Sequence, residues 1–143
     1  MSDENKALVH RYLDLWNLGK PELIDEVCAD DYLEYDPAYP DGKINRDGVK
    51  QLITMYKLAF PDLHFAVLDA IGEAENVAVH WRMAGTNRGE FRGQPPTGQH
   101  GESEGMTLMR VRDGKLFESR TFWDPSGFRR QVGTEAAAGA ASA

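Results

Sequence analysis

An alternating pattern over residues 76–86 constrains the fold of this chain more than any other feature of its sequence. One side of the alternation is apolar and the other is small or polar: Val77, Val79, Trp81 and Met83 against Ala78, His80 and Arg82. Because successive side chains of a β-strand point to opposite sides, the pattern predicts a strand with one face on a core. The stretch TNRGEFRGQPPTG at 86–98 is rich in glycine and proline and predicts a surface connection to another strand.

Further strand patterns precede and follow this run. They cover residues 31–36, 63–71, 102–112 and 115–124. The last two are separated by Asp113-Gly114, a dipeptide that favours the tight turn of a β-hairpin. The later strands are therefore expected to pair in antiparallel fashion.

The first part of the chain shows helical rather than strand periodicity. Apolar residues recur at helical spacing over residues 4–17, 21–28 and 46–59. Helices followed by strands predict an α+β fold, in which three N-terminal helices cover a curved antiparallel sheet and the resulting cone encloses a cavity. We expect one domain over residues 1–133 and a disordered tail of small residues at 134–143.

Composition narrows the classes of partner. The formal charge of −7 argues against a nucleic-acid partner, and no apolar run approaches the roughly 18–20 residues that a membrane span needs. Cys28 is the one cysteine, which excludes an internal disulfide and indicates a reducing compartment, so we expect a cytoplasmic protein. The histidines show no metal-ligand spacing, so neither a metal nor another cofactor is expected.

The end of the last predicted strand carries two candidate catalytic residues. Asp124 follows two aromatic residues, and burial against them would raise its pKa towards neutrality. Arg120 lies four residues earlier, so in a regular strand both side chains face the same side, where the guanidinium would keep Asp124 ionised. The structural alternatives are a cap formed by Asp124 on the turn into PSGF and a plain salt bridge for Arg120.

The short strand at 31–36 ends on two further candidates. Tyr35 and Asp36 immediately precede Pro37 and an irregular loop, which places them at the mouth of the predicted cone. Both are candidate ligand contacts, and the alternative for Asp36 is a turn-forming role.

Several motifs together resemble those of one family. They are ALVHRYLDLWNLGKPELIDEV, FPDLHFAV, VAVHWRMAGTNRGEFRGQPPTG, RVRDGK and the closing WD…RRQVG. The set is similar to the SnoaL-like polyketide cyclases and ester cyclases of the nuclear transport factor 2-like superfamily. The resemblance spans nearly the whole chain up to residue 133 and implies a cone-shaped α+β fold and a homodimer or higher homo-oligomer built from the outer face of the sheet.

The same resemblance implies roles for particular residues. Cyclases of the family use an acid at the position of Asp124 as general acid/base. Histidines are frequent in the family where this chain has Tyr35 and Asn87, and the amide of Asn87 can replace one of them as a donor to an oxyanion. A tryptophan is common at the position of Arg120, which hints at a distinctive substrate.

Aromatic residues on the predicted inner surfaces complete the candidate site. Tyr12 and Trp16 lie one helical turn apart on the first helix, which lines the cavity in this superfamily, and Tyr56 lies on the third. Trp81 is on the inward face of the strand at 76–86. All four are candidate ligand contacts, and plain core packing is the alternative.

We therefore expect a cofactor-independent cyclase or isomerase that acts on a polyketide-like or other natural-product carbonyl substrate through general acid/base catalysis. Two alternatives remain at this point. One is a hydrolase or epoxide-opening cyclase, which needs an ionised carboxylate and a second polar partner. The other is a small-molecule binding protein without turnover.

Overall fold

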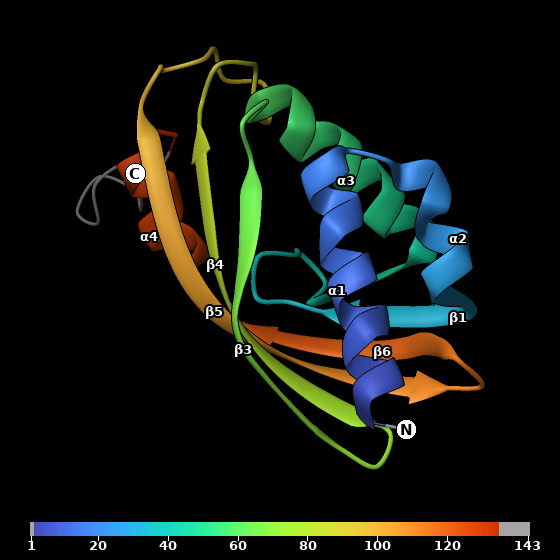
Figure 1. The fold of residues 1–143 in the computed structure, drawn as a ribbon. Coiled ribbons are helices and arrows are strands. Elements are labelled where there is room, and N and C mark those ends of the chain that lie inside the picture. The colour runs from blue at the N-terminus through green and yellow to red at the C-terminus, as the bar shows by residue number, and fades with distance from the viewer. Residues whose placement is uncertain (1, 135–143) are drawn as a thin grey trace.

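The computed structural model describes residues 2–134, in which a strongly curved sheet carries helices on its concave side (Figure 1). The elements in chain order are α1 Ser2–Leu18, a 3-10 turn η1 Pro21–Leu23, α2 Ile24–Val27, β1 Cys28–Tyr35, β2 Lys43–Asn45, α3 Arg46–Ala59, β3 His64–Glu73, β4 Asn76–Thr86, β5 His100–Arg112, β6 Lys115–Phe122 and α4 Pro125–Gln131. The α+β class that the sequence predicts is confirmed. The predicted tail at 134–143 lies outside the described residues except for Thr134.

The six strands form one mixed sheet in the order β2-β1-β6-β5-β4-β3. Every neighbouring pair is antiparallel except β1 and β6, which run parallel, with Tyr35 opposite Arg120 at one end. The antiparallel pairing expected for the later strands is confirmed, and the one parallel pair makes the sheet mixed rather than purely antiparallel. A strand can lie parallel to another only after a long crossover, and here all the chain between β1 and β6 provides it.

The turn between β5 and β6 follows the sequence prediction. Asp113 and Gly114 have φ angles of 53° and 77°, the left-handed values that a two-residue hairpin turn requires. β5 and β6 then pair from Arg112 opposite Lys115 to Met106 opposite Phe122.

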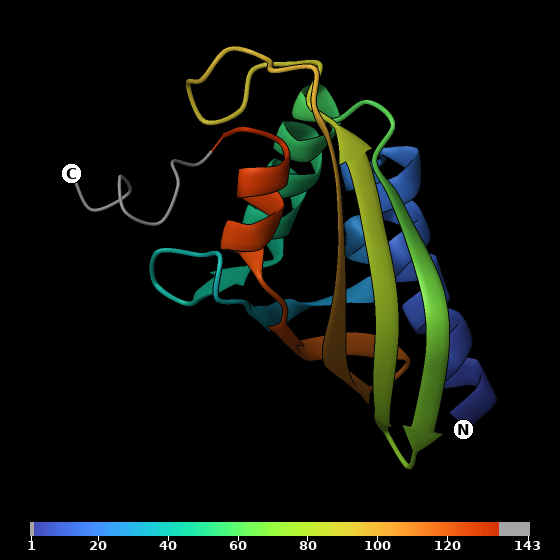
Figure 2. The same cartoon turned by 90° about the vertical axis from the view of Figure 1, so that its left-hand side faces the viewer.

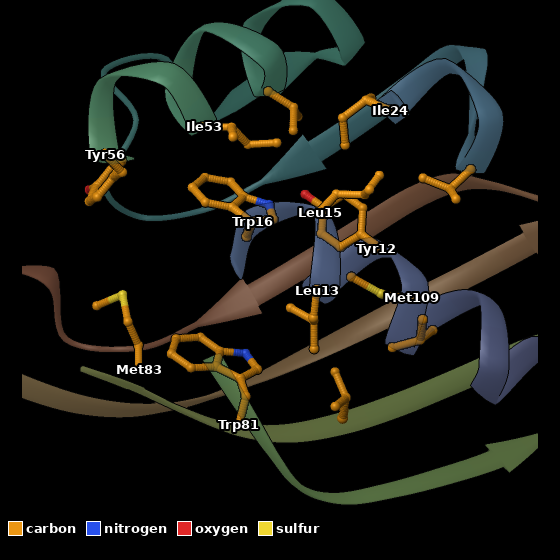
Figure 3. Packing of buried hydrophobic residues seen from close by; sticks show 14 of the residues in the cluster. Tyr12, Leu13, Leu15, Trp16, Ile24, Ile53, Tyr56, Trp81, Met83 and Met109 are labelled. Atoms are coloured by element: carbon orange, nitrogen blue, oxygen red, sulfur yellow. The ribbon is translucent and has the colours of Figure 1, made fainter. Parts of the chain in front are cut away.

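The helices bury their apolar stripes against the concave face. Figure 3 shows Trp81, Met83 and Met109 pointing from the sheet towards Tyr12 and Trp16 of α1, and all five are buried. α3 begins behind Asn45, whose side-chain oxygen accepts a hydrogen bond from the backbone N–H of Gly48 at 2.9 Å. No helix in residues 2–134 is both long enough and apolar enough to cross a membrane.

Two elements escaped the sequence prediction. β2 has three residues, too few for an alternating pattern to show, and pairs with the end of β1. α4 lies beside the half of β5 that extends past the end of β6 (Figure 2). There the side-chain amide of Gln131 donates to the carbonyl of Glu102 at 2.9 Å and accepts from its N–H at 2.8 Å. A side chain thus pairs the backbone groups that the strand leaves open at this edge.

The predicted connection at 86–98 joins β4 to β5 and folds back on α3. The N–H groups of Arg88 and Gly89 both donate to the carbonyl of Ala59, at 3.0 and 3.1 Å. A Cβ at residue 89 would stand 2.0 Å from the backbone oxygen of Leu58, so only glycine permits this close approach. Phe91 is buried beyond it and packs on Tyr56 and Phe60.

Candidate functional site

A cavity lies between the concave face of the sheet, helices α1 and α3 and the loop at residues 36–42. The volume of the cavity is about 70 Å³, counted as the space that the centre of a water molecule can occupy. Most of its lining is aromatic or aliphatic: Tyr12, Leu13, Trp16, Ala38, Tyr39, Leu52, Tyr56, Phe65, Trp81, Met83, Met109 and Trp123. Glu34, Asp36, Thr107 and Thr121 are the other lining residues.

The tryptophans form the aromatic walls and also carry polar groups towards defined partners. The indole N–H of Trp81 donates to Thr107 Oγ1 at 2.9 Å, and this hydroxyl lies 2.9 Å from Thr121 Oγ1. Trp16 and Trp81 both pack edge-on against Phe65, with ring centroids 5.7 and 5.4 Å apart. Such walls suit a flat unsaturated ligand.

Glu34 is a buried carboxylate held by hydroxyl groups. Its Oε1 accepts from Tyr12 at 2.5 Å, from Tyr32 at 2.8 Å and from Ser119 at 3.4 Å, and its Oε2 accepts from Tyr39 at 2.5 Å. Burial, followed by the charge of Glu34, raises the pKa of each of the three phenols. The phenols therefore remain protonated donors at neutral pH.

Asp36 is the carboxylate best placed to exchange protons with a ligand. Its Oδ1 accepts from the backbone N–H of Ala38 at 2.8 Å and from the indole N–H of Trp123 at 2.9 Å. Within the described part of the chain, Oδ2 accepts no hydrogen bond. Burial raises the pKa of Asp36 and outweighs the opposing effect of these two hydrogen bonds, with a smaller rise from the charge of Glu34.

Tyr56 lies on the opposite wall, on α3. Burial raises the pKa of its phenol, and the charge of Arg92 acts against this rise. The charge of Asp36 adds to the rise. Both side chains line the cavity, where Asp36 can accept a proton and Tyr56 can donate a hydrogen bond.

The structure brings together five of the residues that the sequence singles out and separates the other four. Tyr12, Trp16, Asp36, Tyr56 and Trp81 line the cavity. Tyr35, Asn87, Arg120 and Asp124 do not.

Asp124 stands at the N-terminus of α4, exposed to solvent. Its Oδ1 accepts from the backbone N–H of Gly127 at 2.9 Å. The expected burial of Asp124 against the preceding aromatics is therefore wrong, because the strand ends at Phe122 and the chain turns into a helix that the sequence prediction lacked. The capping alternative describes the observed geometry.

Arg120 and Tyr35 lie on the outer face of the sheet. The Arg120 guanidinium sits 4.1 Å from the centre of the Tyr35 ring, and its Nε is 3.3 Å from Glu118. Because Thr121 and Trp123 line the cavity, the even-numbered Arg120 faces away from it. Arg120 lies on the outer face and Asp124 caps α4, so the two candidate catalytic residues do not meet in the cavity.

Asn87 is fully buried, but in the connection between β4 and β5 rather than in the cavity. Its amide donates to the carbonyl of Gly89 at 2.9 Å and its side-chain oxygen accepts from the N–H of Thr97 at 2.9 Å. These bonds hold the two ends of the loop together, so Asn87 is not free to bind an oxyanion.

Sequence reasoning missed Glu34 and Tyr39. The segment 31–36 did contain a signal for Glu34, because alternation places Tyr32, Glu34 and Asp36 on one face and a tyrosine on that face is expected to be buried. No comparable signal marks Tyr39, which lies in the irregular loop and reaches Glu34 only through the tertiary fold.

Comparison with known proteins agrees with this architecture. Residues 6–132 match the family described as SnoaL-like polyketide cyclase. The chain belongs to this family. The SnoaL-like relatives include aklanonic acid methyl ester cyclase DauD from Streptomyces sp. (strain C5), 29% identical over 88% of this chain and 80% of DauD. Nogalonic acid methyl ester cyclase from Streptomyces nogalater is 29% identical over 82% of this chain and 89% of its own length.

Two solved structures of Streptomyces proteins superpose closely on this SnoaL-like chain. IdmH from Streptomyces antibioticus gives a TM-score of 0.77 at 28% identity, covering 90% of this chain and 98% of IdmH. AclR from Streptomyces galilaeus, described as a hydroxylase, gives a TM-score of 0.81 at 26% identity. The match covers 96% of this chain and 89% of AclR. Within residues 2–134, no cluster of three or more histidine, cysteine or acidic side chains has the arrangement of a metal site.

Proposed function

We propose that this protein is a cyclase or isomerase that moves a proton within a polyketide-like carbonyl compound, with Asp36 as the general acid/base. The observation that carries the proposal is the state of Asp36. One oxygen is fixed by Ala38 and Trp123, the other accepts no hydrogen bond within the described residues, and burial raises its pKa. A carboxylate in such surroundings is a stronger base than one in water and can return the proton later.

The proposed step balances without any further reactant. Asp36 takes a proton from a carbon next to a carbonyl group, and the negative charge passes to the carbonyl oxygen as an enolate. The Tyr56 phenol donates a hydrogen bond to this oxygen. In ring closure the enolate carbon bonds to a second carbonyl carbon of the same molecule, and the proton of Asp36 passes to the resulting alkoxide. The aromatic walls hold the flexible chain in a reactive shape, which reduces the entropic part of the barrier.

The test compares two carboxylates of the same chain. We expect the protein to consume aklanonic acid methyl ester or nogalonic acid methyl ester, the compounds after which its relatives are named, or to exchange their acidic C–H for deuterium in D₂O. Asp36→Asn keeps the acceptor oxygen for Ala38 and Trp123 but cannot take a proton. Its rate should fall by about 10²–10⁴-fold, while Asp124→Asn should stay within about threefold because it retains a capping side chain.

A loss of rate in Asp124→Asn with full activity in Asp36→Asn would move the acid/base role to Asp124, at the position that the family resemblance indicates. A binding protein without turnover is the second candidate. It is favoured by the capping geometry of Asp124 and predicts that both esters bind, with neither consumption nor deuterium exchange, in the native protein and in both variants.

A further inference from the structure

The two oxygens of Glu34 have different surroundings. Oε1 accepts hydrogen bonds from Tyr12, Tyr32 and Ser119. Within the described residues, Oε2 accepts only the bond from Tyr39. The side chain is nearly buried, at 5% exposure, so the loss of the Tyr39 hydroxyl would leave one oxygen of a buried charge without a donor. A buried charged oxygen without a donor is energetically costly, which favours another hydrogen-bond donor in the place of Tyr39.

Tyr39 differs from the other two phenols in what holds it. Tyr12 belongs to helix α1 and Tyr32 to strand β1; both are buried, and their rings pack 6.3 Å apart. Tyr39 is half-buried and belongs to the loop at residues 36–42. Backbone bonds within the loop close it around Tyr39, such as Asp36 N–H to the Gly42 carbonyl at 3.1 Å and Gly42 N–H to the Tyr39 carbonyl at 2.9 Å. Of the three donors, Tyr39 can leave Glu34 with the least disturbance of the core.

Glu34 and Tyr39 both line the cavity. When the Tyr39 ring moves away, Oε2 faces the space in which a ligand lies, next to aromatic walls. A hydroxyl on an unsaturated ring or chain offers the same O–H donor as the phenol that has left. Because burial, followed by the charge of Glu34, raises the pKa of Tyr39, a ligand phenol at this position would also stay protonated.

We propose that Glu34 Oε2 is the binding site for a phenolic or enolic hydroxyl of the ligand, and that Tyr39 occupies this site in the free protein. The inference deepens the proposed function by naming a group of the substrate, and it concerns binding rather than proton transfer. Tyr39 is then a side chain of the protein that competes with the ligand.

Because Tyr39 competes with the ligand, removal of its hydroxyl should increase ligand affinity rather than reduce it. Tyr39→Phe keeps the ring and removes only the hydroxyl, so it should bind 2-naphthol more tightly than the native protein. One hydrogen bond to a charged acceptor corresponds to about tenfold or more in affinity. The probe is matched by 2-methoxynaphthalene, which has the same rings without a donor and should bind both proteins equally within about twofold. Isothermal titration calorimetry measures both.

Tyr12→Phe is the matched control variant, because it removes a phenol from Oε1, which keeps two other donors. It should not raise the affinity for 2-naphthol. Adding Glu34→Gln to Tyr39→Phe should abolish the gain, since the amide carries no charge. Near-ultraviolet circular dichroism checks that each variant is folded.

A folded Tyr39→Phe protein with unchanged, weaker or undetectable binding of 2-naphthol would overturn the inference. An equal gain for the methyl ether would also overturn it, because the added affinity would then come from space rather than from a hydrogen bond. These outcomes are independent of the proposed function, whose failure would show as unaltered turnover or exchange in Asp36→Asn.

Discussion

Two carboxylates at the end of strand β1, Glu34 within it and Asp36 just beyond it, illustrate how neighbouring residues acquire different roles. Glu34 and Asp36 are two positions apart, so both face the cavity. Glu34 is surrounded by hydroxyl donors and Asp36 by one backbone N–H and one indole N–H. The first is suited to hold a group in place, and the second retains an oxygen that can exchange a proton.

Asp124 has a structural role that stability measurements can isolate. Asp124→Ala removes the acceptor for Gly127 N–H at the start of α4 and should lower the free energy of unfolding by about 1 kcal/mol. Urea denaturation followed by tryptophan fluorescence measures this. Asp124→Asn is the control and should be nearly neutral, because asparagine caps helices as well as aspartate does. Equal stability of the alanine variant and the native protein would contradict the capping role.

At the scale of elements, the cavity depends on close approach of strand β5 to the aromatic wall. Gly105 lies opposite Trp81 in the pairing of β4 with β5. A Cβ at residue 105 would stand 2.3 Å from the Trp81 ring and 2.9 Å from the Cβ of Trp123. The wall therefore requires a residue without a side chain at this point of the strand.

Gly105→Ala should displace the Trp81 ring and destabilise the fold by about 1–3 kcal/mol, the usual effect of overpacking. It should also change the tryptophan emission, since all three tryptophans line the cavity. Ser103→Ala is a control on the same strand that adds no atom, and its effect should stay within about 0.5 kcal/mol. If Gly105→Ala matched this control in stability and emission, the wall would have more room than its geometry indicates.

Prediction from sequence succeeded for elements with long periodic patterns and failed for short or interrupted ones. The strand at 76–86 and the helix at 46–59 have the expected bounds, because burial of one face imposes a regular pattern over many residues. β2 and α4 are too short to show one. The sequence prediction lacked α4 and continued the last strand to residue 124. A continued strand would place Asp124 beside the aromatic residues, which is why it was expected in the cavity.

At the scale of the whole molecule, the outer face of the sheet exposes large apolar side chains to solvent. Met106 and Phe122 are neighbours in the pairing of β5 with β6 and are 47% and 69% exposed. On the same face of β5, Glu102 and Glu104 precede Met106, and Arg110 and Arg112 follow it. Two copies related by a two-fold axis near Met106 would place opposite charges together. We propose that this face forms the homodimer that the family resemblance implies.

Met106→Lys should convert a dimer into a monomer, because it places two positive charges close to the proposed axis. Size-exclusion chromatography with light scattering gives the mass directly. Leu58→Lys is the control, since Leu58 is an exposed leucine on α3, away from the outer face, and the variant should leave the mass unchanged. A native protein that stays monomeric at high concentration would exclude this interface.

The sequence by itself determined the fold class, most of the long elements, and five of the residues that line the cavity. The fold class and the long elements follow from periodic burial and local turn chemistry, which act between residues close in the chain. The cavity role of Tyr12 and Trp16 followed from the family resemblance, since their helical spacing is equally typical of plain core packing. The tertiary structure decided which carboxylates face the ligand. Tyr39 holds Glu34, Trp123 holds Asp36, and the turn into α4 places Asp124 at a helix cap. These arrangements depend on how the loop, the strand ends and α4 fold in three dimensions, which the alternation of a strand does not predict.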